Sequence, residues 1–488
     1  MPLRDMDREQ MWLLPPTLDE LLPPDHPARF VAEFVDALDR QDWAEMGVDP
    51  EGDPLGAPAY HPRALLSVWL YGFMTNVRSC RKLEAACRDQ IPFLWLTGWQ
   101  HPDHNTLWRF YRDHRQAMRS LFKRTVRTAM VMDLVDLAVQ AVDGTKVIAN
   151  ASKDRDYTPD QLERLLARVE RAIEDLEAQN EEGEDAPPAR LPEQLADQKA
   201  LRERVRQAME EQASRQRPPS RYGGRNRINL TDWDAKLVKT RQGTMPGYNA
   251  QAMVSPIASD GDTTGMLMTA VDVVDQTNDA GQLTPMMEQA EAVTGVRTPM
   301  TLADAGYFGG GHLEASRRRG QQVAMPDTAR PLDDPYHKDQ FSYDEDSDSY
   351  ICPNGERLPF VGARKHQGSP VRIYRVASAS VCLDCPAFGV CTREYRLGRS
   401  LQIGPYDRAL RNHREWMSTE AAKEAYKLRK QLVEPVFGII KEQLGARRFL
   451  LRGLDNVAAE WTVLATAFNL RTLWRAWRSR SDIQCTPT

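Results

Sequence analysis

The chain has 488 residues, of which 41% are hydrophobic and 27% are charged, and its formal net charge at pH 7 is −5. This length suggests two to four domains of ordinary soluble composition, and the acidic balance excludes a chain that is basic throughout. Any nucleic-acid-binding surface must therefore come from local clusters of Lys and Arg. No apolar run approaches the roughly 20 residues of a membrane span, and the N-terminus lacks an apolar signal core, so we expect a cytoplasmic protein without a membrane partner.

Residues 1–130 are predicted to form an all-helical domain. Pro62 begins an apolar segment that ends at Gly72, and a second helix is expected from Ser79 to Cys87. Capping residues at 103–106 precede a third helix, and a basic segment follows at 112–127. Several short helices before a basic one suit a helix-turn-helix-like DNA-binding unit, although an ordinary helical bundle fits the same pattern.

From residue 131 onward, strands and helices alternate. We expect strands at 134–143, 247–254, 265–274, 299–303 and 322–325, and helices at about 278–293, 311–319 and 419–443, the first capped by Asn278 and Asp279. A charged helical insertion, 159–216, interrupts this order. The element order predicts an α/β fold of the ribonuclease-H-like type, a mixed sheet with helices on both faces, built from 131–158, 217–330 and 405–475.

Three carboxylates are candidates for a catalytic metal site. Asp143 follows an apolar run and precedes Gly144, and Asp304 follows a short buried strand. Open α/β sheets present their sites at strand ends, and carboxylates are the ligands that Mg²⁺ prefers. Glu434 lies in a predicted helix that Pro435 is expected to kink. An aspartate after a strand is also a common turn residue or helix cap, so the combination carries the prediction.

The segments around these carboxylates resemble the three catalytic motifs of bacterial insertion-sequence transposases with a DDE site. They are residues 142–146, 302–307 and 433–441, and segments 60–115, 447–454 and 467–470 extend the resemblance over most of the chain. The third motif is similar to the Tyr-Arg-Glu-Lys signature, here Tyr426, Arg429, Glu434 and Lys441. That signature usually has three residues between Arg and Glu. Here there are four, so either Arg429 or Lys430 can be the residue that contacts DNA.

The resemblance implies a metal-dependent enzyme that cuts and joins DNA at the terminal inverted repeats of an insertion sequence. Asp143, Asp304 and Glu434 would bind two Mg²⁺ or Mn²⁺ ions, and water and then a DNA 3′-hydroxyl would attack a phosphodiester. The residues implied to contact DNA are Tyr426, Arg429, Lys430, Lys441, Arg447 and Arg448. The implied partners are double-stranded DNA of the transposon ends and the target, and a second copy of the chain in a homodimer. A nucleoid-associated location follows from these partners.

Two alternatives to an active transposase stay open at this point. One is a DNA-binding protein that derives from such an enzyme and no longer catalyses the reaction. The other is a ribonuclease-H-like nuclease that acts on a different nucleic acid. A cleavage and strand-transfer assay separates all three, because a plain nuclease gives no joined product.

Residues 331–404 are predicted to form an insertion that contains four of the seven cysteines. They are Cys352, Cys382, Cys385 and Cys391, and their spacing is compatible with a structural Zn²⁺ site. The alternatives are that these four cysteines are reduced free thiols or that they form disulfides. Nothing in the sequence places these cysteines with the carboxylates.

Overall fold

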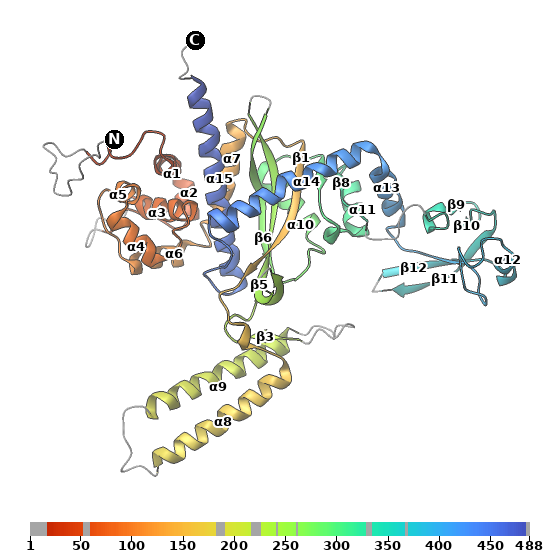
Figure 1. The fold of residues 1–488 in the computed structure, drawn as a ribbon, viewed down its shortest axis with the longest axis horizontal. Coiled ribbons are helices and arrows are strands. Elements are labelled where there is room, and N and C mark those ends of the chain that lie inside the picture. Colours follow the sequence, from red (N-terminus) through yellow and green to blue (C-terminus); the bar gives the residue numbers. More distant parts are fainter. Residues whose placement is uncertain are drawn as a thin grey trace, which may run out of the picture. The chain divides into compact units, whose positions relative to one another are not determined.

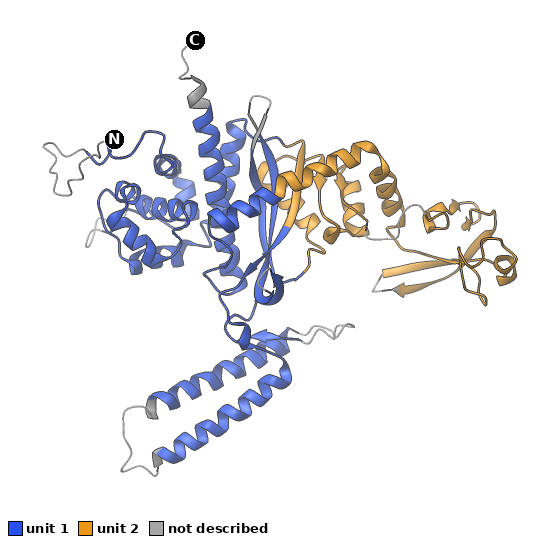
Figure 2. Cartoon of the chain, in the orientation of Figure 1, with its two compact units in different colours: residues 1–136, 144–277, 434–488 blue, residues 137–143, 278–433 orange. Residues whose placement is uncertain are grey.

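The computed structural model describes residues 17–51, 59–181, 191–215, 226–240, 243–259, 262–327, 334–366 and 369–484. The chain forms two compact units (Figure 2). Unit 1 comprises residues 1–136, 144–277 and 434–488, and unit 2 comprises residues 137–143 and 278–433. The predicted domain boundaries at 216/217 and 330/331 lie outside the described residues.

A mixed sheet of six strands has the order β4-β5-β1-β7-β8, with β6 paired to β5. The strands are β1 (Val139–Ile148), β4 (Lys236–Thr240), β5 (Gly243–Ser259), β6 (Asp262–Val274), β7 (Met300–Leu302) and β8 (Gln322–Ala324). The pairs β4-β5 and β5-β6 are antiparallel, whereas β1-β7 and β7-β8 are parallel, with Gln140 opposite Thr301 and Thr301 opposite Val323. The predicted mixed α/β class is confirmed.

Strand β1 is longer than its apolar run indicates. We expected it to end near Asp143, but it continues through Asp143 to Ile148. The reason is local, since Thr145, Val147 and Ile148 are buried and have strand-forming, β-branched side chains. Asp143 therefore lies inside a strand, two residues beyond the last position that pairs with β7, Ala141.

Among the described residues of unit 1, seven short helices form the predicted N-terminal helical region. They are α1 (Pro27–Asp36), α2 (Arg40–Glu45), α3 (Pro62–Met74), α4 (Cys80–Asp89), α5 (Ile91–Thr97), α6 (His104–His114) and α7 (Arg119–Val131). Polar side chains accept hydrogen bonds at several N-termini, as Ser79 does for α4 and Asp103 for α6. In the core, Trp69 stacks on Tyr111 with ring centroids 4.3 Å apart, and its indole N–H donates to the Leu107 carbonyl.

Helix α15 (Leu454–Gln484) packs on β6, α7 and α3 within unit 1 (Figure 1). Its Asn469 side chain is fully buried and exchanges hydrogen bonds of 2.9 Å with the backbone of Met268 on β6, both as donor and as acceptor. The same amide donates to Thr125 on α7 at 3.1 Å. A buried amide with each group paired fixes the helix at one register on the sheet.

The segment after β1 forms an antiparallel pair of long helices, α8 (Pro159–Glu181) and α9 (Leu191–Ser214) (Figure 1). Their apolar faces bury Leu162, Val169 and Val205 together with Ile228 of the small pair β2 (Asp156–Tyr157) and β3 (Ile228–Asn229). A single-turn 3₁₀ helix, Lys153–Arg155, precedes β2. The amphipathic spacing of the apolar residues thus explains why two highly charged segments pair as a hairpin.

Unit 2 holds the remaining helices and a second sheet. Its helices are α10 (Leu283–Thr294), α11 (Gly310–Arg318), α12 (Ala379–Leu383), α13 (Asp407–Ser418) and most of α14 (Glu420–Gly438), with 3₁₀ turns Ala305–Tyr307 and Lys338–Gln340. The five antiparallel strands are β9 (Ser342–Asp344), β10 (Ser349–Ile351), β11 (Arg357–His366), β12 (Ser369–Arg375) and β13 (Ser400–Ile403), in the order β13-β12-β11-β10-β9. The sequence analysis did not anticipate this second sheet.

Two helix ends differ from expectation. Helix α10 begins at Leu283 with Gln282 as its N-cap, so Asn278 and Asp279 do not cap it. Helix α14 continues past Pro435 to Gly438 and then changes to a π-helical turn, Ile439–Gln443. Proline has no amide proton to donate to the carbonyl four residues earlier, yet α14 stays α-helical from Pro435 to Gly438.

Candidate active site

Two of the three candidate carboxylates lie at one arginine in unit 2. A terminal nitrogen of Arg429 on α14 is 2.9 Å from Asp143 Oδ2 and 3.8 Å from Asp304 Oδ2. The side chains of Arg429 and Asp143 are 10% and 17% exposed, and that of Asp304 is 36% exposed. Three segments far apart in the sequence therefore meet at a partly buried cluster of charge, and only its Asp304 edge reaches solvent substantially.

The backbone around Asp304 holds its carboxylate in place. Asp304 follows β7 directly and caps the 3₁₀ turn, because its Oδ1 accepts the Gly306 amide proton at 2.8 Å. A Cβ atom at Gly306 would lie 3.0 Å from Asp304 Oδ1 and 3.5 Å from Asp279 Oδ2. Gly306 thus permits the close approach of two carboxylates, which is a physical reason for glycine at this position.

Asp279 is a further acidic residue beside this cluster that the sequence analysis treated only as a helix cap. Tyr307 is fully buried next to it. Burial, and then the charges of Asp279, Asp143 and Asp304, raise the pKa of the Tyr307 phenol far above its ordinary value. Burial also raises the pKa of Tyr426, with the Arg429 charge opposing it. Both phenols therefore stay neutral and can donate hydrogen bonds, which suits a site that faces anions.

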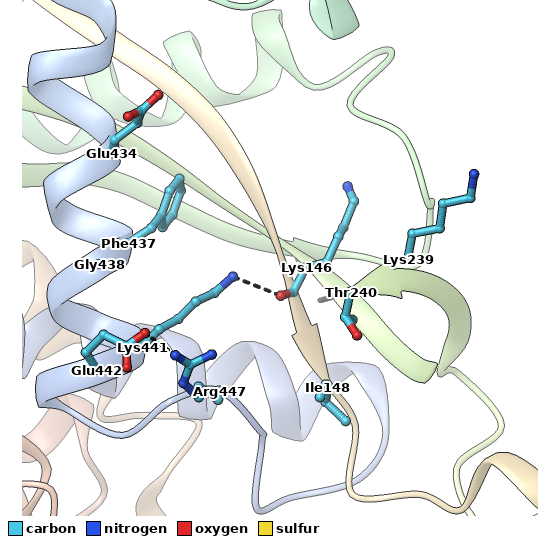
Figure 3. A pocket seen from close by; sticks show the side chains of 10 residues that line it. All are labelled: Lys146, Ile148, Lys239, Thr240, Glu434, Phe437, Gly438, Lys441, Glu442 and Arg447. Carbon is cyan, nitrogen blue, oxygen red and sulfur yellow. Dashed lines mark hydrogen bonds and ion pairs between the residues drawn. The ribbon is translucent and has the colours of Figure 1, made fainter. Parts of the chain in front are cut away.

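Glu434 belongs to unit 1, where it lines a cavity of about 590 Å³ (Figure 3). The cavity lies between the end of α14, β1 and β4, and we call it the basic cavity. It is lined by Lys146, Ile148, Lys239, Thr240, Glu434, Phe437, Gly438, Lys441, Glu442 and Arg447. Four of these side chains are cationic and two are acidic, so the lining carries a net positive charge. Glu434 itself is exposed at its edge.

The basic cavity contains two of the residues implied to contact DNA. Lys441 reaches across to β1, where its ammonium group donates to the Lys146 carbonyl at 3.1 Å, as Figure 3 shows. Arg447 pairs with Glu442. Lys146 and Lys239 were missed because their sequence neighbourhoods are unremarkable, and only the fold brings β1 and β4 to the same cavity. For Lys146, its place three residues after Asp143 was an available signal.

The other four predicted DNA contacts, Tyr426, Arg429, Lys430 and Arg448, do not line the basic cavity. Arg448 is exposed and its backbone bridges to Ile148. On α14, Arg429 is buried against the aspartates, whereas Lys430 is exposed. The structure therefore places the two residues differently: Arg429 compensates carboxylates and Lys430 faces solvent.

The four cysteines of the predicted insertion line one small cavity in unit 2, and we call them the cysteine cluster: Cys352, Cys382, Cys385 and Cys391. All six cysteines that the structure describes are free thiols, so no disulfide forms among them. Within the described ranges, no group of three or more His, Cys, Asp or Glu side chains is arranged to hold a metal ion.

Comparison with protein-family models gives two matches. Residues 351–474 match the model described as Transposase DDE domain, and residues 16–113 match the model described as Transposase domain (DUF772). Each match covers less than half of the chain, so these two segments are similar to transposase domains. A DDE domain implies catalysis of DNA transposition with divalent metal ions and DNA as partner, which agrees with the coarse expectations. A search of curated proteins gave no match.

The matched ranges include only part of the candidate site. Glu434, Arg429 and the cysteine cluster lie within the DDE match, whereas Asp143 and Asp304 precede it. The catalytic role of these two aspartates therefore stays a prediction of the sequence motifs, and the structure adds their shared contact with Arg429. In the part of the chain that the structure describes, no helix has both the length and the apolar character of a membrane span.

Proposed function

We propose that the protein cleaves transposon-end DNA and joins it to target DNA, using Asp143, Asp304 and Glu434 as a carboxylate triad. The observation that supports this most is the convergence of Asp143 and Asp304 on Arg429. Arg429, which lies on α14 within the DDE match, thus contacts Asp143 in β1 and Asp304 just after β7. Strands β1 and β7 are parallel neighbours in the sheet. We further propose that this catalytic domain has the ribonuclease-H-like arrangement, with Glu434 completing the triad from α14.

The donor set at Asp143 and Asp304 fits a hard divalent cation. Both residues offer carboxylate oxygens, the ligands of Mg²⁺ and Mn²⁺, and one cationic nitrogen already lies within 4 Å of both. Glu434 would supply the third carboxylate. When bound, two divalent ions activate the attacking oxygen and stabilise the leaving oxygen of a phosphodiester.

The chain's own residues would position the DNA and balance charge. Arg429 contacts both aspartates, and its guanidinium would be able to donate to a phosphate oxygen if metal ions neutralised these carboxylates. The basic cavity next to Glu434 would take the backbone of the strand that is cut, with Lys441 already oriented by its bond to β1. The exposed cations Lys430, Arg447 and Arg448 would extend this phosphate contact, and the neutral Tyr426 would donate a hydrogen bond to it.

Recognition of the terminal inverted repeats is proposed for the N-terminal helical region, α1 to α7, because it matches a transposase domain of its own. We propose that a homodimer brings two transposon ends together. The basic cavity would contact phosphates and supply affinity, whereas the N-terminal helical region would contact bases and supply sequence specificity.

The decisive experiment assays cleavage and strand transfer on DNA that carries the flanking inverted repeats, with Mg²⁺ or Mn²⁺ as the metal. Asp143→Asn, Asp304→Asn and Glu434→Gln each remove one charged ligand and keep the side-chain shape. Loss of one metal ligand is expected to lower the rate by about 1000-fold or more, while DNA binding changes about twofold at most. Glu415→Gln, an exposed carboxylate on α13, is the matched control and should keep full activity.

The outcomes separate the alternatives. Retained cleavage in all three variants would exclude the triad. Cleavage without joined product would indicate a nuclease, and binding without cleavage in the unsubstituted chain would indicate an inactive derivative. Replacing Mg²⁺ with Fe²⁺ and adding ascorbate and peroxide tests the geometry directly, because backbone scission should occur near residues 143, 304 and 434 together.

A further inference from the structure

We propose that the cysteine cluster binds one structural Zn²⁺ and that this ion holds the second sheet of unit 2 together. The proposal is independent of the catalytic function proposed above. It concerns a site that uses no residue of the carboxylate cluster, and it rests on how the fold brings four distant thiols to one cavity.

The four cysteines come from three separate parts of the insertion. Cys352 follows β10 in the turn that leads to β11, Cys382 lies in α12, and Cys385 and Cys391 lie in the loop after it. All four line a single cavity of about 30 Å³. Three of them, Cys352, Cys382 and Cys391, also pack against the apolar core of the second sheet. A four-thiolate zinc site requires four cysteines around one small space, and every cysteine of the insertion lines this cavity.

Hydrogen-bond donors are aimed at three of the four sulfur atoms. The Glu356 amide lies 3.3 Å from Cys352 Sγ, the Arg399 amide 3.3 Å from Cys382 Sγ, and the Asn354 side-chain amide 3.0 Å from Cys385 Sγ. Neutral thiols gain little from such donors, whereas thiolates bound to a metal are stabilised by them. These three donors supply the outer contacts that such a site needs.

A cation also lies beside the cluster. Arg399 donates from its guanidinium to the carbonyl of Cys391 at 3.0 Å, and its Nε is buried without a hydrogen-bond partner. Four thiolates around Zn²⁺ carry a net charge of about −2, which the Arg399 charge would partly offset. Zn²⁺ is bound by thiolates, so metal binding would release protons from the thiols.

The size of the cavity favours a single ion. A volume of about 30 Å³ is enough for one water-sized occupant, and the remaining lining includes Val376, Val381, Ala387 and Phe388. An iron–sulfur cluster with several iron and sulfide atoms needs more room. As placed, the four sulfur atoms do not form a metal-binding group, so binding requires the thiols to turn toward the cavity that they already line.

The local fold gives zinc a role. Among the described residues, the apolar core of the second sheet consists of six buried side chains: Phe341, Tyr350, Leu358, Tyr374, Val376 and Leu401. A core this small contributes little free energy of folding by itself, and a bound metal ion often stabilises such a small unit. Zn²⁺ would tie the β10–β11 turn to α12 and to the loop that leads to β13.

The test measures metal content in the full chain, purified without added zinc or chelator. We expect about one Zn²⁺ per chain by mass spectrometry, and less than about one tenth of that in Cys382→Ser and Cys385→Ser, because three thiolates hold Zn²⁺ far less tightly. Cys80→Ser, a half-buried thiol of α4 in unit 1, is the matched control and should keep its zinc.

A second measurement does not depend on whether the variants fold. Co²⁺ offered to the metal-stripped unsubstituted chain should give a thiolate-to-cobalt charge-transfer absorption and the visible bands of tetrahedral cobalt. A chelator should expose four additional thiols to a thiol reagent. Absence of zinc from the purified chain together with no cobalt–thiolate absorption overturns the proposal, and so does an iron–sulfur chromophore, or zinc that persists in both cluster variants.

Discussion

The cluster around Arg429 in unit 2 and the basic cavity in unit 1 contain the residues of the proposed active site, yet their electrostatics are opposite. In unit 2, Asp143 and Asp304 surround one arginine, and most of that charge is shielded from solvent. In unit 1, four cations line an open cavity of about 590 Å³ with only Glu434 and Glu442 against them. The first region is built to bind cations and the second to bind a polyanion, which are the two requirements of metal-dependent DNA chemistry.

The largest expected effect comes from removing the cation of the first region. Arg429→Gln leaves Asp143 and Asp304 near one another without their shared partner. Loss of one member of a largely buried charge cluster costs about 3 kcal/mol of unfolding free energy. Chemical denaturation in EDTA measures this loss, and Mg²⁺ should restore part of it because a divalent ion can take over the charge of the arginine.

The neighbouring Lys430 gives the matched control for this variant. It is exposed on the same helix, so Lys430→Gln should change the unfolding free energy by less than about 0.5 kcal/mol. Equal stability of the two variants would show that Arg429 does not hold the aspartates in solution. Equal gains from Mg²⁺ in Arg429→Gln and in the unsubstituted chain would show that no ion replaces the guanidinium.

A smaller effect is expected from the basic cavity. Lys239→Gln and Lys441→Gln each remove one cation from its lining. If each contacts a phosphate, the slope of log K against log salt should fall by about 0.9 per variant, and affinity for duplex DNA should drop several-fold at low salt. Titration of a labelled duplex at several salt concentrations measures both. Lys153→Gln, an exposed lysine of unit 1 outside the cavity, should leave the slope unchanged.

The salt slope of Lys239→Gln is more informative than that of Lys441→Gln. Lys441 belongs to the family signature, whereas Lys239 is known only from its place in the fold. A normal salt slope for Lys239→Gln with a reduced slope for Lys441→Gln would confine the DNA path to α14. Normal slopes in both would mean that the cavity does not bind the DNA backbone.

The same two regions show which parts of the molecule the sequence could reveal. Element types were predictable where the pattern is local: the short strand before Asp304 and the capped N-terminal helices follow from hydrophobic spacing and from residues such as Asp103. The residues at which elements end were less predictable. Strand β1 passes Asp143 because burial of Val147 and Ile148 continues beyond the apolar run, and α14 stays α-helical past Pro435 before it changes to a π-helical turn after Gly438.

Contacts between distant segments could not be predicted from one sequence. Asp279 and Asp304 approach each other only in the folded chain, where both lie against Gly306, and Lys239 reaches the basic cavity only through the β4–β5 pairing. The second sheet was not predicted, although residues such as Leu358 and Phe360 have the spacing of a strand, because the cysteines between its strands are equally typical of an irregular metal-binding insertion. The triad assignment of Asp143, Asp304 and Glu434 stays a prediction of the motifs.

The smallest effect concerns how the second sheet is attached to α13 within unit 2, and it depends on pH. Asp407 pairs with Lys338 and accepts from Arg411 at 2.8 Å. Burial raises the pKa of Asp407, but the hydrogen bonds and charges of Lys338 and Arg411 outweigh burial and hold that pKa below its ordinary value of 3.8. Because the folded state favours the ionised form, the stabilisation is fully present above pH 3.8 and is lost as pH falls through the lowered pKa.

The unsubstituted chain should therefore exceed Asp407→Asn by about 1–2 kcal/mol in unfolding free energy near pH 6, and this difference should shrink below pH 4. Urea unfolding of both chains across that range isolates the contribution, with Glu345→Gln, an exposed carboxylate of β9's turn, as the control that should show no such difference. A gap between the two chains that stays constant down to pH 3 would assign the effect of Asp407→Asn to packing and not to charge.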